Sequence, residues 1–94
     1  MAKSIMQDKK ECYFCSREWG LQTHHVMNGR PYRKYSEQDG LKVYLCYQCH
    51  GEIHRNAEMR ITLKAKAQEA WMDHYGTAAA FRGRYGKNYR PLDE

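Results

Sequence analysis

The stretch that decides the fold contains Cys12-Tyr13-Phe14-Cys15, then His24-His25, then Leu45-Cys46-Tyr47-Gln48-Cys49-His50, and finally His54. All four cysteines of the chain and four of its five histidines lie in this run. Two Cys-x2-Cys pairs provide four sulfur ligands, the number that a closed tetrahedral zinc site requires. We therefore predict a structural zinc ion, Zn²⁺, bound by Cys12, Cys15, Cys46 and Cys49.

The chain has 94 residues, the size of one domain whose core gives only marginal stability without a cross-link. Disulfide bonds are the alternative use of four cysteines, but two short pairs that flank a histidine-rich middle favour zinc. We expect residues 1–10 to be a flexible N-terminal segment and residues 11–94 to be one domain. Within this domain, we expect residues 11–56 to contain the two Cys-x2-Cys pairs, or zinc knuckles, and the metal-binding core. Residues 57–94 would form the C-terminal helices and a basic tail.

The composition is basic, because 16 Lys and Arg residues against 11 Asp and Glu residues give a formal net charge of +5. Such an excess attracts polyanions, of which nucleic acid is the usual one for a small protein. Residues 1–10 are polar and charged, and no run approaches the roughly 20 apolar residues of a membrane span. We therefore expect no signal peptide, no membrane association and a cytoplasmic location with reduced cysteines.

Local signals before residue 56 predict two short strands and a turn. Residues 21–26 and 41–45 have the apolar and β-branched composition of strands, and Asn28-Gly29-Arg30-Pro31 is a turn signal. The stretch 32–40 is polar and basic, and we expect a loop or irregular arm there. The two strands would bring the two cysteine pairs together.

Two helices are expected in the C-terminal part of the chain. Asn56 is a candidate N-cap for the first, whose apolar stripe has helical spacing. Thr77 can cap a final short helix that ends at Gly86. The stripe consists of Met59, Leu63, Ala67, Ala70, Trp71 and His74, and His74 fits a core or helix-end position better than a metal site.

Four histidines lie in the same part of the sequence as the cysteines and are not needed for the zinc site: His24, His25, His50 and His54. His50 and His54 are four positions apart, so a helix would place them on one face, suited to binding one ion. Adjacent strand residues point to opposite faces, so His24 and His25 cannot both bind that ion in the same way. The alternation favours one ligand and one general base, the division of roles by which a single divalent ion and an imidazole hydrolyse a phosphodiester.

These residues resemble the HNH, or ββα-metal, nuclease family, on the strength of His24-His25-Val26, Leu45-Cys46, Cys49-His50 and His54. The family joins two strands to a helix around one divalent ion, and many members add a zinc ion held by two Cys-x2-Cys knuckles. The resemblance implies a small α+β fold: a zinc-stapled ββα-metal core followed by two C-terminal helices. It further implies an endonuclease that nicks or cleaves DNA, with His25 as general base and a second divalent ion (Mg²⁺, Mn²⁺, Ni²⁺ or Zn²⁺) held by His24, His50 and His54.

The chain departs from the family's pattern at the residue that orients the base. Many members carry an asparagine shortly before the second strand, where this chain reads Gln38-Asp39-Gly40-Leu41. Asp39 or Asn28 is the candidate for this role, which fixes the imidazole nitrogen that can accept a proton. Arg33 or Lys34, in the same connection, is a candidate for contacting a backbone phosphate.

Segments outside the core resemble a phage subgroup of the family that includes the RecA-dependent recombination-enhancement nucleases. The likeness implies a phage or prophage source, a role in recombination, and DNA as a partner recognised with little sequence specificity. Recombination proteins such as RecA are further candidate partners. The residues concerned are Arg33-Lys34-Tyr35-Ser36-Glu37, Ala70-Trp71-Met72-Asp73-His74-Tyr75-Gly76, and Phe81, Gly86, Lys87, Asn88 and Tyr89.

Several alternatives stay open at this level. His50 could replace one sulfur in a Cys3His zinc site. The chain could instead be a non-catalytic zinc module that binds DNA or docks onto a protein, or a regulator whose histidines sense metal. The basic C-terminal cluster could track the DNA backbone or form an ordinary solvated surface; it consists of Arg82, Arg84, Lys87 and Arg90, with Tyr85 and Tyr89 interleaved.

Overall fold

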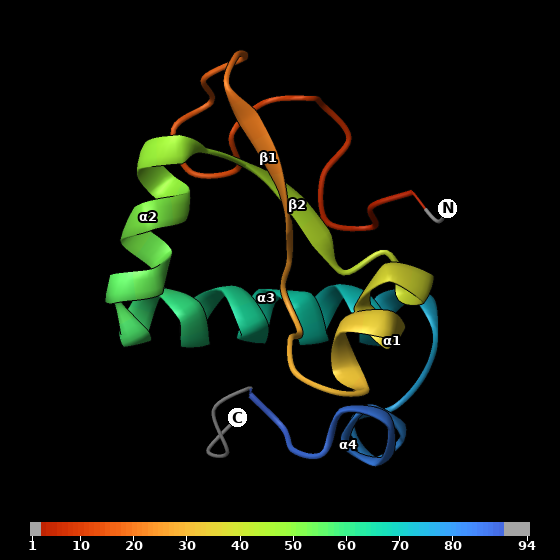
Figure 1. Cartoon of the computed structure of the whole chain (residues 1–94). Coiled ribbons are helices and arrows are strands. Elements are labelled where there is room, and N and C mark those ends of the chain that lie inside the picture. The colour runs from red at the N-terminus through yellow and green to blue at the C-terminus, as the bar shows by residue number, and fades with distance from the viewer. Residues whose placement is uncertain (1–2, 90–94) are drawn as a thin grey trace.

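A small antiparallel hairpin stands at the centre of the computed structural model, which describes residues 3–89 and shows a small α+β fold (Figure 1). In these residues the two strands are accompanied by four helices. α3 crosses one end of the hairpin, with α2 at one side and α1 and α4 at the other (Figure 1). The elements are β1 (Leu21–His25), α1 (Tyr32–Asp39), β2 (Lys42–Cys46), α2 (Tyr47–Arg55), α3 (Ala57–His74) and α4 (Ala78–Tyr85).

The register of the strands decides where the histidines point. Leu21 pairs with Cys46 at one end of the hairpin, and His25 pairs with Lys42 at the other. His24 is buried, whereas His25 is half-buried and contacts α1, because consecutive strand residues face opposite sides of a sheet. The two predicted strands are therefore confirmed, with bounds shifted by one residue.

The expected loop at residues 32–40 is wrong, because this segment forms helix α1. Its inner face consists of Tyr32, Tyr35, Ser36 and Asp39, which are buried or half-buried and have helical spacing. Half of this face is polar, so the segment carries no apolar periodicity that would reveal a helix. The hydroxyl of Ser36 accepts a bond from the Met27 amide and donates one to the Leu41 carbonyl, which satisfies it inside the core.

The N-terminal segment, expected to be flexible, packs against the rest of the fold through residues 4–7. The Ile5 amide donates to the Gly40 carbonyl at 2.9 Å, and the Ser4 hydroxyl donates to the Lys42 carbonyl at 2.6 Å. The Tyr44 amide donates to Oε1 of Gln7 at 2.9 Å. These bonds cover the edge of β2 that β1 leaves unpaired, and an unpaired edge is the part of a sheet that most needs such cover.

Both C-terminal helices begin at their predicted caps, and the second ends at the predicted glycine. The Asn56 side chain accepts from the Met59 amide at the start of α3, and Thr77 accepts from the Ala80 amide at the start of α4. Gly86 ends α4 with a φ of 91°, a left-handed conformation that glycine adopts without strain. Within the predicted stripe Leu63, Ala67 and Trp71 are buried, while His74 is exposed at the end of α3.

A buried carboxylate ties α1 to α3 and α4. One oxygen of Asp39, Oδ2, accepts from Nε1 of Trp71 at 2.8 Å, from Nε of Arg84 at 2.6 Å and from the Tyr85 hydroxyl at 2.7 Å. The other, Oδ1, accepts from the Arg84 guanidinium at 3.0 Å. Four donors satisfy this charge, as its burial requires.

None of the helices in residues 3–89 is long and apolar enough to cross a membrane.

Candidate metal and catalytic site

The hairpin register brings the two cysteine pairs into one cluster. The sulfur atoms of Cys12, Cys15, Cys46 and Cys49 all lie within 4.8 Å of one another. Cys12 and Cys15 come from the segment before β1, Cys46 ends β2, and Cys49 lies in the first turn of α2, where its amide donates to the Cys46 sulfur. The cluster could hold a structural metal such as zinc, which four thiolates bind tetrahedrally.

The protonation of these thiols explains why a cation suits them. Burial raises the pKa of Cys12, but amide groups of Cys46, Cys15 and Phe14 outweigh it and lower the pKa to about 6. Burial and the neighbouring sulfurs raise the pKa of Cys49 well above its usual value. The hydrogen bond from the Cys49 amide also lowers the pKa of Cys46, while the pKa of Cys15, despite a backbone amide that lowers it, is raised overall by its neighbouring sulfurs. Two thiolates therefore form more readily than the other two, and a divalent cation removes the resistance to further negative charge.

Three imidazoles form a second cluster beside the first. The ring centroids of His24 and His50 are 5.3 Å apart, those of His50 and His54 are 4.9 Å apart, and those of His24 and His54 are 6.3 Å apart. Nitrogens about 2.1 Å from one ion would place such centroids roughly 5 Å apart. Two of the three centroid separations are close to this value, and the third is wider by about an ångström. Within residues 3–89, the four cysteines alone form a group whose ligand atoms all lie within 4.8 Å of one another.

The environment of His24 and His50 favours their neutral form, which is the form that binds a metal. Burial, followed by repulsion from His50 and His54, lowers the pKa of His24 to about 4. Burial and repulsion from His54 also lower the pKa of His50. In addition, Nδ1 of His50 bonds to Oε1 of Gln22. Because an amide oxygen only accepts, this bond puts the proton on Nδ1 and leaves Nε2 of His50 free to bind a metal.

His25 contacts a carboxylate that the sequence reading did not identify. Its Nε2 lies 2.8 Å from Oε1 of Glu37, on α1, and the other carboxylate oxygen accepts from Nζ of Lys42 at 2.9 Å. Hydrogen bonds from Lys42 and then from His25 lower the pKa of Glu37. An ionised carboxylate only accepts, so Nε2 of His25 donates to Glu37, and in the neutral tautomer that this bond selects the lone pair is on Nδ1.

Asp39 does not orient His25, which corrects one of the two candidates from the sequence. Its carboxylate instead accepts hydrogen bonds from Trp71, Arg84 and Tyr85. The other candidate, Asn28, lines the hollow that contains the histidines. Glu37 was missed because its segment was expected to be a loop, whereas the helix places it two residues before Asp39 on a different face.

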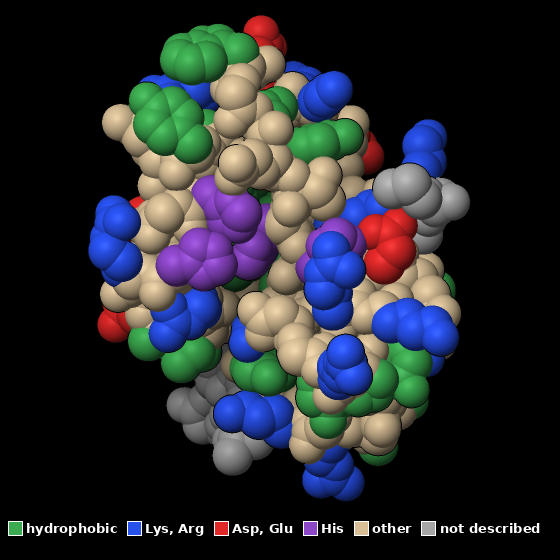
Figure 2. Space-filling model, in the orientation of Figure 1, with side chains coloured by type: hydrophobic (Ala, Val, Ile, Leu, Met, Phe, Trp, Pro, Cys, Tyr) green, Lys and Arg blue, Asp and Glu red, His purple; other side chains and the backbone are tan. Residues whose placement is uncertain are grey.

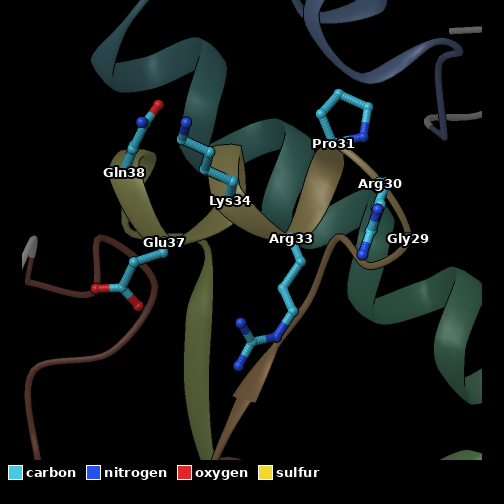
Figure 3. A pocket seen from close by; sticks show the side chains of 7 residues that line it. All are labelled: Gly29, Arg30, Pro31, Arg33, Lys34, Glu37 and Gln38. Atoms are coloured by element: carbon cyan, nitrogen blue, oxygen red, sulfur yellow. The ribbon is translucent and has the colours of Figure 1, made fainter.

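Arg33 lines two neighbouring hollows in the surface. The first, of about 200 Å³, contains Thr23, Asn28 and the histidines 24, 25, 50 and 54. The second, of about 680 Å³, is lined by Arg30, Arg33, Lys34, Glu37 and neighbouring residues. Arg33 extends from α1 along the end of β1 (Figure 3), and Figure 2 shows the histidine patch flanked by Lys and Arg side chains. The structure thus brings Arg33, as well as His25, to the histidine cluster.

The basic C-terminal cluster is only partly free. Arg84 pairs with Asp39 and lies over the Tyr35 ring at 4.2 Å, and Tyr85 is buried. Tyr89 is held through its amide by Gln68 at 2.7 Å. Arg82 and Lys87 are exposed, and Arg90 lies outside the described residues. The alternative reading of this cluster as a DNA-tracking surface therefore loses Arg84, which has a structural role.

Comparison of the chain with protein-family models, with curated proteins and with solved structures gave no match.

Proposed function

We propose that this chain is a metal-dependent endonuclease of the HNH, ββα-metal type, which nicks or cleaves DNA. One observation carries the proposal: His25, held by Glu37, lines the same hollow as three clustered imidazoles and Arg33. A base, a metal-binding set and a cation side by side are the parts that phosphodiester hydrolysis needs. The four-cysteine cluster supports both strands of this arrangement from outside the hollow. A phage source and a role in recombination belong to the proposal through the resemblance alone.

The chemistry of the proposed base follows from its hydrogen bond. Because Nε2 of His25 donates to Glu37, Nδ1 accepts the proton of the attacking water. Lys42 holds Glu37 ionised, and the carboxylate then stabilises the imidazolium that forms. The guanidinium of Arg33 binds the phosphate and offsets its charge.

The three imidazoles would hold the second ion, His24 from β1 and His50 and His54 from α2. When bound, a divalent ion supplies stabilisation of the charge on the phosphate and on the departing 3′ oxygen. Imidazole ligands suit Zn²⁺ and Ni²⁺, while Mg²⁺ prefers oxygen ligands. Among Mg²⁺, Mn²⁺, Ni²⁺ and Zn²⁺, we therefore expect Mg²⁺ to support the lowest activity at equal concentration.

The direct test is cleavage of supercoiled plasmid by the full chain with each divalent ion and with chelator. We expect nicked circles with 5′ phosphate ends, and a loss of at least a hundredfold in His25→Ala. His74→Ala is the matched control, because it removes an exposed histidine at the end of α3. Absence of nicking with all four ions, or cleavage by His25→Ala at the parental rate, would refute the proposal.

A second candidate function is a non-catalytic zinc module that binds DNA. The observation in its favour is that, within residues 3–89, the four cysteines form a tighter ligand group than the histidines do. It predicts one bound zinc per chain and DNA binding that His25→Ala does not change. The plasmid assay separates the two functions, because only the endonuclease converts supercoiled DNA to nicked circles.

A further inference from the structure

Two exposed aromatic rings flank one arginine at the zinc end of the molecule. Trp19 is 65% exposed and Tyr47 is 57% exposed, the largest values among the large hydrophobic residues of the described chain. The guanidinium carbon of Arg17 lies 4.7 Å from the Trp19 ring centroid and 5.7 Å from that of Tyr47. Rings exposed to this extent in one patch indicate a binding surface rather than a packed core.

The arginine between the rings is fixed in place. One terminal nitrogen, Nη2, donates to Oε1 of Gln48 at 3.0 Å. The other, Nη1, is buried without a hydrogen-bond partner in the described residues. Leaving a buried donor unpaired costs free energy that a solvated arginine avoids. Arg17 is therefore held between the two rings by its bond to Gln48 and by its ring contacts, with one donor left unpaired.

The rings belong to the same two parts of the chain that carry the histidines of the hollow. Tyr47 is the first residue of α2 and precedes His50 by three positions, so the two side chains share a helix face. Trp19 lies two residues before β1, the strand that carries His24 and His25. Hydrophobic side chains gather on the same face of the molecule as the histidine patch (Figure 2). The shared helix face of Tyr47 and His50 therefore links the rings to the histidine cluster.

We propose that Trp19, Arg17 and Tyr47 form a stacking platform for the unpaired bases of single-stranded DNA. Every base offers a π face to an aromatic ring or a guanidinium, whereas a duplex hides these faces inside its stack. The net charge of +5 favours a polyanion over an acidic or neutral surface as the occupant. This inference deepens the proposed function, on which it rests, by assigning single-stranded DNA as the substrate form.

Binding of a fluorescein-labelled 15-nucleotide oligothymidylate tests the platform, compared with a blunt duplex of the same length. The full chain is used with its zinc and without a second divalent ion, so that no cleavage occurs. We expect Trp19→Ala and Tyr47→Ala each to raise the Kd for the single strand about tenfold and to change that for the duplex less than twofold. Trp19→Phe, which keeps a ring, should retain most of the affinity.

Ile61→Ala is the matched control, because Ile61 is 56% exposed on α3 and carries no ring. Quenching of tryptophan emission gives a second measurement, since Trp71 is 6% exposed and Trp19 supplies the accessible signal. A Kd for the single strand that stays within twofold in both Trp19→Ala and Tyr47→Ala overturns the proposal. So does an equal loss on the duplex, or self-association of the parent that both variants abolish, which would assign the rings to a protein contact.

The outcome is separable from that of the endonuclease proposal. Single-strand binding that depends on the rings, without cleavage of either supercoiled plasmid or single-stranded circular DNA, supports the platform and refutes the nuclease. Nicking that depends on His25, with binding indifferent to the rings, supports the nuclease and refutes the platform.

Discussion

Nε2 of His25 lies 2.8 Å from Oε1 of Glu37, a residue in the helix that connects the two strands. The carboxylate also accepts from Lys42, which neighbours β1 through the hairpin register. This three-residue chain fixes the ring orientation of His25 and the nitrogen that is free to accept a proton. The sequence suggested Asp39 or Asn28 as the residue that orients the His25 ring. In the structure, Glu37 contacts Nε2 of this ring.

Glu37→Gln should lower the turnover of plasmid nicking by about 10- to 100-fold, the usual effect of losing a carboxylate behind a functional histidine. The change keeps the shape of the side chain and removes the charge that stabilises the imidazolium. Initial rates at saturating metal measure it, and the Kd for uncleaved DNA should stay within about threefold. Glu52→Gln is the control, since Glu52 pairs with Arg55 on the surface of α2 at 3.1 Å. A parental rate in Glu37→Gln would remove Glu37 from the mechanism.

Asp39→Asn should lower the free energy of unfolding by about 3 kcal/mol, because Arg84 loses its buried partner and the donors on Trp71 and Tyr85 lose a charged acceptor. Urea denaturation of the zinc-loaded chain measures this loss. Asp73→Asn, at an exposed position of α3, should change stability by less than about 0.5 kcal/mol. Equal stability of the two variants would show that the Asp39 contacts contribute little to the fold.

Metal analysis should find one tightly bound zinc per chain, and Cys12→Ser should lose it together with the folded state. A site of four thiolates depends on every sulfur, and structural zinc contributes directly to folding. His50→Ala should keep the zinc, because all four sulfurs already lie within 4.8 Å of one another. Loss of zinc in His50→Ala would instead indicate a Cys3His site.

Stability should fall with acidification below pH 6.5 when the histidine cluster holds no ion. Burial and repulsion from the neighbouring rings lower the pKa of His24 to about 4 in the folded chain, whereas the unfolded chain keeps the ordinary value of about 6.5. Between these values the unfolded state binds more protons, so folding weakens as the pH falls through this window. From pH 7 to 5 the parent should lose about 1 kcal/mol more than His24→Gln, measured by urea denaturation. Equal losses would show that His24 titrates normally.

The sequence by itself determined the parts that depend on local spacing. The Cys-x2-Cys pairs, the His-x3-His pair and the caps at Asn56 and Thr77 each reflect the geometry of a few adjacent residues. The strands followed from composition, and their pairing places Cys46 opposite Leu21. These signals were sufficient to predict strands and helices that bring the four cysteines together. Each signal depends only on a few neighbouring residues.

Tertiary structure decided what depends on contacts between distant residues. Helix α1 has a half-polar inner face, and its Ser36 and Asp39 are stable there only because the hairpin, α3 and α4 supply their partners. The packing of residues 4–7 on β2 likewise needs an open strand edge that no local pattern reveals. The contact of Glu37 with His25 also depends on tertiary structure. The two residues are 12 positions apart, so their hydrogen bond depends on how the chain folds back and cannot be predicted from sequence periodicity.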